Sequence, residues 1–189
     1  MGDRRGDPRA GGPPSPVALR RAEARDAARL ALVGAASFLE SFADDHDGDA
    51  VVAHLRATHG EDWYAARLAD PAFALWIAEA PLGAPVGYAL LGPATLAIVA
   101  GQPARLDDLE LKRIYMLSRW HGAGHGRALF DAVLAEARAR GAARLLLSVY
   151  VRNAKARAFY ARLGFLPIGE APFTVGAQTY HDIVLARDV

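Results

Sequence analysis

The chain has 189 residues, of which 52% are hydrophobic and none is cysteine. This length allows one globular domain with a substantial core, and the absence of cysteine excludes disulfides, thiolate metal sites and a cysteine nucleophile. Lys and Arg number 22 against 21 Asp and Glu, a net charge of +1, so we expect neither nucleic acid nor a membrane surface as a partner.

The first 16 residues, MGDRRGDPRAGGPPSP, combine arginine, glycine and proline without the apolar segment of a signal peptide. We therefore expect a disordered leader over 1–16 and a single domain over 17–189. Since no apolar run approaches the roughly 18 residues of a membrane span, we expect a cytoplasmic protein.

The first part of the chain predicts a strand and three helices: 17–22, a helix capped by Asp26 and ending near Phe42, 50–58 and 61–69. Three later runs have the pattern of strands: 73–80, 85–92 and 109–117. The first two form a probable hairpin, and 93–105 between the second and third reads as a loop. In the third strand, Ile114 and Met116 face one way, and Tyr115 and Leu117 the other.

A glycine-rich segment, RWHGAGHGRALF over 119–130, separates this strand from a helix that ends near Gly141. Three glycines at a helix start indicate either a hinge or a backbone that approaches a ligand closely, because glycine costs a helix roughly 0.5–1 kcal/mol relative to alanine. Free N–H groups and the helix dipole would suit an anion. The spacing lacks the GK[ST] of a nucleotide P-loop, and its third glycine comes too early for the dinucleotide fingerprint.

The rest of the chain predicts a buried strand, a helix and two final strands: 144–151, a helix capped by Asn153 and closed by Gly164, FLPIGE, and TYHDIVLA. The order of the elements indicates an α/β or α+β sheet with covered faces.

The segment over about 109–166 resembles the GNAT superfamily of acetyl-CoA-dependent N-acetyltransferases. The family's pattern N-x-x-A-x-x-F-Y-x-x-x-G-F is matched by Asn153, Ala156, Phe159, Tyr160, Gly164 and Phe165, and its Q/R-x-x-G-x-G/A by Gly124 and Gly126, with His121 in place of glutamine or arginine. The resemblance implies a mixed, mostly antiparallel twisted sheet, with splayed central parallel strands and helices on both faces. It also implies acetyl-CoA as cosubstrate and no metal, and it is compatible with a homodimer, which is common on this fold.

By this resemblance, the diphosphate of acetyl-CoA would lie on the turn that follows His121: Gly122, Ala123, Gly124, His125, Gly126 and Arg127. The pantetheine arm would pair with the backbone of Ile114, Tyr115 and Met116, and an N–H at or near Met116 would hold the oxyanion. Asn153, an ordinary helix cap by position, would also contact the pantetheine. A tyrosine acid falls on Tyr160, which could otherwise be a core residue.

Acetyl transfer requires an amine that has lost its proton and an acid for the departing thiolate. A phenol of pKa ~10 can protonate a thiolate whose conjugate acid has a pKa of ~8.5, which suits Tyr160. Glu110 is the favoured base, alone or through water, although a carboxylate paired with Lys112 or Arg113 is the alternative.

The acceptor is predicted to be a small-molecule amine. ELKRIYML over 110–117 resembles PaiA-type polyamine acetyltransferases, whereas a protein N-terminus, a lysine or an antibiotic amine are alternative acceptors. A non-catalytic acyl-CoA-binding module on the same fold is a further alternative. Four acidic residues surround His46 in the sequence: Asp44, Asp45, Asp47 and Asp49. They form either a solvated loop or a binding site for a cationic amine.

Overall fold

A computed structural model describes residues 16–189, so nearly all of the expected leader lies outside the described residues. The strands are β1 (Ala18–Arg21), β2 (Ala74–Glu79), β3 (Pro85–Pro93), β4 (Ala100–Gly101), β5 (Asp108–Met116), β6 (Arg144–Tyr150), β7 (Leu166–Val175) and β8 (Gln178–Asp188). The α-helices are α1 (Ala27–Phe42), α2 (Gly48–Thr58), α3 (Glu61–Ala69), α4 (His125–Ala139) and α5 (Ala154–Arg162). None of the helices within 16–189 is long and apolar enough to span a membrane.

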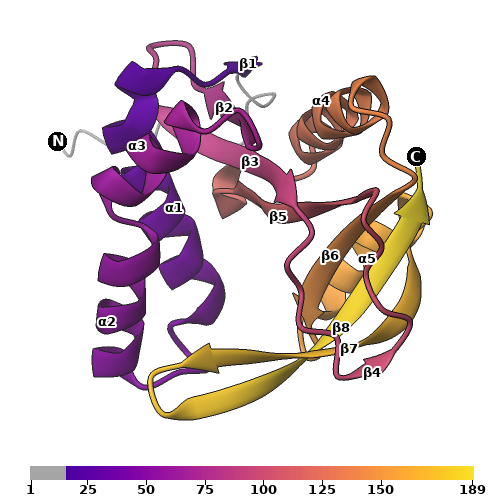
Figure 1. Cartoon of the computed structure of the whole chain (residues 1–189). Coiled ribbons are helices and arrows are strands. Elements are labelled where there is room, and N and C mark those ends of the chain that lie inside the picture. Colours follow the sequence, from indigo (N-terminus) through magenta and orange to yellow (C-terminus); the bar gives the residue numbers. More distant parts are fainter. Residues whose placement is uncertain (1–15) are drawn as a thin grey trace, which may run out of the picture.

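The strands form one mixed sheet in the order β1-β2-β3-β5-β6-β8-β7-β4 (Figure 1). Each neighbouring pair is antiparallel except β5 and β6, which are parallel and paired only where 108–110 meets 144–146. Both strands continue for several residues beyond this ladder, so the sheet opens between them. The predicted splayed pair of parallel strands is confirmed.

A buried ion pair stands at the closed end of this opening. Asp108 and Arg144 begin the two parallel strands opposite each other, and Arg144 donates from Nε to Oδ1 at 3.0 Å and from Nη2 to Oδ2 at 2.7 Å. The side chains are 0% and 6% exposed. Because these two hydrogen bonds are charge-assisted and bidentate, they fix where the ladder begins.

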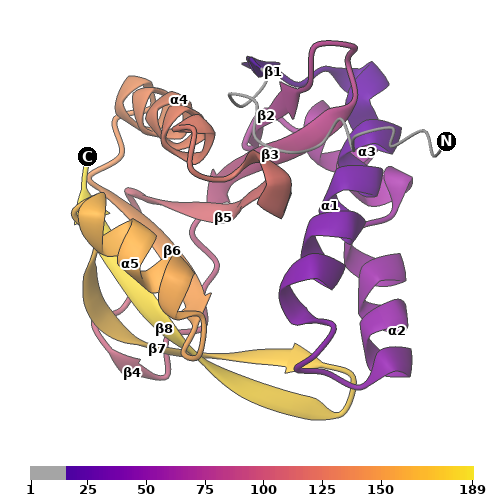
Figure 2. The same ribbon diagram turned by 180° about the vertical axis from the view of Figure 1, so that it is seen from behind.

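Helices cover both faces of the sheet (Figures 1 and 2). The apolar sides of α4 and α5 pack in one cluster, which includes Met116 and Ile114 of β5. Residues of α1 and α3 pack in a second cluster on the opposite face, joined by Tyr115 and Leu117. The alternation predicted for the central strand is therefore confirmed, as are helices on both faces.

Some details differ from the prediction. Most of 93–105 is irregular as expected, but it contains β4, whose two residues pair with β7. Asp26 precedes α1 as predicted, yet its side chain does not cap the helix. Its carboxylate instead accepts hydrogen bonds from Arg20 at 2.6 and 2.7 Å, because a guanidinium in reach offers charged donors.

The C-terminal hairpin is longer than the sequence pattern predicted. β7 and β8 run to a tight turn at Gly176, and the far end of the hairpin lies beneath α1 and α2 (Figure 1). There Phe173 contacts His54 of α2 edge to face at 5.6 Å. The last strands of the chain thus meet helices from its first third.

Candidate active site

The glycine turn before α4 has the properties of an anion cradle. Gly122 and Gly124 have φ angles of +86° and +83°, which other residues rarely adopt. A Cβ at either position would meet nothing within 4 Å, so packing within the protein does not explain these glycines. Both leave open space above the backbone.

The start of α4 leaves its first N–H groups free for a ligand. Gly124 is the N-cap, and no side chain caps the helix. The N–H groups of His125, Gly126 and Arg127 have no acceptor among residues 16–189. Since unpaired N–H groups and the helix dipole both favour negative charge, these residues fit the diphosphate of a CoA molecule.

His121 bridges two elements at the mouth of the opening. Its Nε2 lies 2.7 Å from the Met116 carbonyl oxygen, and its Nδ1 lies 2.6 Å from Nζ of Lys155 on α5. One neutral tautomer satisfies both contacts, with Nε2–H donating to the carbonyl and Nδ1 accepting from the ammonium. His121 thereby joins the end of β5 to the start of α5, and Lys155 brings a positive charge next to the glycine turn.

His125 begins α4, and its Nε2 is buried without a hydrogen-bond partner among the described residues. Neither the sequence pattern nor the contacts of His125 explain why a histidine occupies this position.

Tyr160 lies on the buried side of α5, where it is 9% exposed. Its ring packs edge to face on Phe165, with 5.7 Å between the ring centroids. The ring of Tyr160 is therefore part of the core, as the alternative interpretation predicted. Burial raises the pKa of the phenol well above its usual value, and Tyr115 adds to the rise. Tyr160 and Tyr115 thus lie within electrostatic range across the open strands.

Asn153 is the N-cap of α5, as predicted. Its side-chain oxygen accepts from the N–H of Ala156 at 3.0 Å. This bond places the start of α5, and with it Tyr160 two turns further on, beside the end of β6.

The surroundings of Glu110 match the alternative to a catalytic base, which is a carboxylate paired with a neighbouring cation. Its carboxylate is buried at 7% exposure, and Oε2 accepts from Lys112 Nζ at 2.7 Å and from the Thr95 N–H at 2.8 Å. The pairing with Lys112, rather than with Arg113, is the one formed.

Arg113 contacts the helices α2 and α3 rather than Glu110. Its guanidinium donates to the Tyr64 hydroxyl at 3.0 Å and to the Thr58 carbonyl at 2.9 Å, and lies over the Trp63 ring at 4.1 Å. It therefore joins β5 to α2 and α3.

Sequence reasoning missed a buried carboxylate near the opening. Asp182 of β8 is 7% exposed, and its Oδ1 has no hydrogen-bond partner among residues 16–189. The available signal was a single acid inside the apolar strand TYHDIVLA, because an ionisable group on a buried strand needs a reason.

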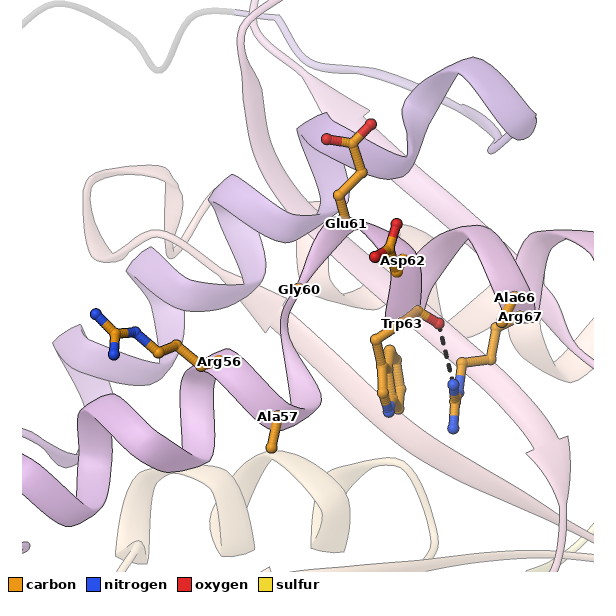
Figure 3. Close-up of a pocket in the computed structure, with 8 residues that line it drawn as sticks. All are labelled: Arg56, Ala57, Gly60, Glu61, Asp62, Trp63, Ala66 and Arg67. Carbon is orange, nitrogen blue, oxygen red and sulfur yellow. Dashed lines mark hydrogen bonds between the residues drawn. The ribbon is translucent and has the colours of Figure 1, made fainter.

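A separate hollow lies on the outer surface between α2 and α3, lined by Arg56, Glu61, Asp62, Trp63 and Arg67 among others (Figure 3). Arg67 lies over the Trp63 ring at 3.6 Å and donates to the Trp63 carbonyl, so its charged group is already held by protein. None of its lining residues belongs to the glycine turn. Among residues 16–189, no three His, Asp or Glu side chains gather in a way that could hold a metal ion.

Two parallel strands open beside a helix that begins at a glycine turn and has no side-chain cap. This geometry is that of a protein that binds an extended, phosphate-bearing cofactor across its sheet. Comparisons with known proteins identify the family. Residues 35–165 match the family described as Acetyltransferase (GNAT) family. An uncharacterised N-acetyltransferase of Mycobacterium tuberculosis is 34% identical over 168 residues, which cover 87% of this chain and 98% of the relative.

Two solved structures share the fold. The PaiA N-acetyltransferase of Thermoplasma acidophilum, in complex with coenzyme A, has a TM-score of 0.73 at 16% identity and covers 92% of this chain and 99% of its own. YncA of Salmonella typhimurium with acetyl-CoA has a TM-score of 0.64 at 20% identity, covering 92% and 94%. The chain therefore belongs to the GNAT family of acetyltransferases, whose general reaction uses acetyl-CoA.

Proposed function

We propose that this protein transfers the acetyl group of acetyl-CoA to a primary amine by direct attack in a ternary complex, with Tyr160 as general acid. One observation carries the proposal: the glycine turn with its free N–H groups lies beside α5, where Gly126 faces the Phe159 ring, and the neighbouring Tyr160 packs in one cluster with Met116 of β5. A cofactor with its diphosphate on the turn and its arm in the opening would bring its thioester towards the phenol.

The chemistry of the opening suits this division of roles. Burial keeps the Tyr160 phenol protonated at neutral pH, and a thiolate in the same buried environment is destabilised, which favours proton transfer to it. Asn153 would contact the pantetheine as well as cap α5. An N–H at or near Met116 would hold the negative oxygen that forms when the amine attacks.

We propose a small cationic amine, with polyamines first, as the acceptor. Two features support this choice: the likeness of ELKRIYML to PaiA-type enzymes, and the exposed acidic residues of the α1–α2 loop and the first turn of α2, namely Asp44, Asp45, Asp47 and Asp49. Their neighbour His46 contacts the ring of Tyr180 at 4.4 Å, so this acidic loop adjoins the α1 side of the opening.

The test is a CoA-release assay with spermidine, an aminoglycoside, an N-terminal peptide and a lysine peptide. Tyr160→Phe is expected to lower kcat by on the order of 10²-fold, while calorimetry shows unchanged binding of acetyl-CoA. Tyr88→Phe is the matched control, because it removes a buried hydroxyl that has no hydrogen-bond partner among the described residues. Equal kcat in the two variants would remove Tyr160 from the acid role, and tight acetyl-CoA binding without any turnover would favour the non-catalytic module.

A further inference from the structure

Four aromatic rings form a wall on the α1 and α2 side of the opening. This aromatic cluster comprises Phe42, His46, Tyr150 and Tyr180. His46 lies 4.4 Å from Tyr180 and 5.7 Å from Phe42 between ring centroids, and Tyr150 lies 5.8 Å from Tyr180. All four side chains are half-buried and lie outside the three hydrophobic clusters formed by residues 16–189. Phe42 packs on the buried Phe38 at 4.7 Å, whereas the half-buried edge of the cluster can present a π-face to a cation.

Asp182 lies on the same face as this cluster. It is directly opposite Tyr150 in the β6–β8 ladder, and Tyr180 precedes it by two residues on β8, so the three side chains project to one side. The neighbouring Ile183 and Leu185 face the other way, into the cluster beneath α4 and α5. Asp182 therefore lies at the inner end of the aromatic wall.

The Asp182 carboxylate has an acceptor oxygen to spare. No Lys, Arg or His within the described chain forms an ion pair with it. Burial raises the pKa of this carboxyl, and the nearby Ser148 hydroxyl acts in the opposite direction. A buried carboxylate without a cationic partner is costly, and a cationic ligand would offset that cost.

Asp182 also lies beside the end of β6, one of the two strands that border the opening, because it pairs with Tyr150. The pKa of Tyr115 is raised to about 12, mainly by burial, and the negative charge of Asp182 contributes. Tyr115 in turn contributes to the raised pKa of Tyr160. Tyr160 packs in the cluster beneath α4 and α5 with Ile183 and Leu185, so it lies on the face of the sheet opposite to Asp182.

From this arrangement we propose that Asp182 is the catalytic residue on the acceptor side: it binds the ammonium group of a primary amine seated against the aromatic cluster and takes one proton from it. This inference rests on the proposed function. It assigns to Asp182 the step that the sequence suggested for Glu110, whose Oε2 is already occupied by Lys112 and Thr95.

The proton balance is as follows. The ammonium gives one proton to Asp182, and the neutral nitrogen forms a bond to the acetyl carbon while the carbon–sulfur bond breaks. Tyr160 gives its proton to the departing thiolate, and the second proton of the nitrogen, lost as the amide forms, passes through solvent to restore the Tyr160 phenol. Asp182 returns its proton to solvent. Burial favours the transfer, because it raises the pKa of a carboxyl and lowers that of an amine.

The experiment measures amine binding apart from turnover. CoA-loaded wild type, Asp182→Asn, Asp182→Glu and Asp188→Asn are titrated calorimetrically with spermidine, butylamine and an alanyl peptide, and with neutral 1-butanol. Asp188 is an exposed carboxylate on the same strand, which makes it the matched control. Circular dichroism and acetyl-CoA affinity verify that each variant is folded.

We expect at least one amine, and not butanol, to bind the wild type and Asp188→Asn, and its affinity to fall by tenfold or more in Asp182→Asn, since a charged hydrogen bond is worth about 1.5–3 kcal/mol. Asp182→Glu should recover part of this loss. In the CoA-release assay, kcat of Asp182→Asn should fall by on the order of 10²-fold.

Amine binding that is equal in wild type and Asp182→Asn, or absent from the wild type, would overturn the inference. Amine binding that depends on Asp182 without any turnover would support the amine site and count against the proposed transferase function instead. The two failures are therefore distinguishable.

Discussion

Replacing Gly124 by alanine tests the anion cradle. At a φ of +83° an L-residue costs roughly 1–2 kcal/mol, and because a Cβ there would meet nothing within 4 Å, this backbone strain is the whole expected cost to folding. At about 2–4 °C per kcal/mol for a chain of this size, the melting temperature should fall by about 2–8 °C.

The effect on the cofactor should exceed the effect on folding. The added methyl group projects into the space through which a diphosphate would approach the N–H groups of the turn. A hydrogen bond to a charged group is worth about 1.5–3 kcal/mol, so losing one such bond should weaken acetyl-CoA binding by roughly 10- to 100-fold.

Gly141→Ala provides the matched control, since Gly141 follows the other end of α4 with a φ of +72° and equally open space. Thermal unfolding and calorimetric titration with acetyl-CoA measure both quantities for both variants. Similar losses of stability, with weakened cofactor binding only in Gly124→Ala, are expected. Equal cofactor affinity in the two variants would refute the assignment of the turn as the phosphate site.

Two further predictions concern stability. Asp108→Asn breaks a buried ion pair and should lower the free energy of unfolding by about 3–5 kcal/mol. Asp131→Asn breaks an exposed pair with Arg127 and should lower it by no more than about 1 kcal/mol. Urea unfolding would measure both, and a smaller loss for Asp108→Asn than for Asp131→Asn would contradict the role given to Asp108. Hydrogen bonds from Arg20 lower the pKa of Asp26 from 3.8 to about 2, so its contribution of roughly 2 kcal/mol is present above pH ~4 and is lost as the pH falls towards 2. Urea unfolding of Asp26→Asn should show this deficit at pH 7 and a shrinking one below pH 4, and a deficit independent of pH would exclude the ionised carboxylate as its source.

The sequence predicted the fold well where periodicity and caps act locally. Alternation assigned Ile114 and Tyr115 to opposite faces, and Asn153 marked the start of α5. The glycine spacing pointed to the turn before α4, because a positive φ angle is a local property of the backbone.

The parts that sequence reasoning missed depend on contacts between distant segments. The partner of Asp26 is a strand residue rather than its own helix end, and β4 exists only through its pairing with β7. No local pattern specifies whether Glu110 is occupied by Lys112 or free to act as a base. The role proposed for Asp182 depends on the strand pairing that places it beside Tyr150 and on the ring of Phe42 from α1, which contacts Tyr150.

The long β7–β8 hairpin carries two residues of the proposed acceptor site, Tyr180 and Asp182. The match to the family covers residues 35–165 and so contains the glycine turn, β5, β6 and α5. The hairpin lies beyond that match, and Tyr180 on it packs against Tyr150 of β6 on one side of the proposed acceptor site. Under the proposed acceptor site, we expect that exchanging this hairpin between GNAT proteins changes which amine is acetylated while binding of acetyl-CoA at the glycine turn is retained.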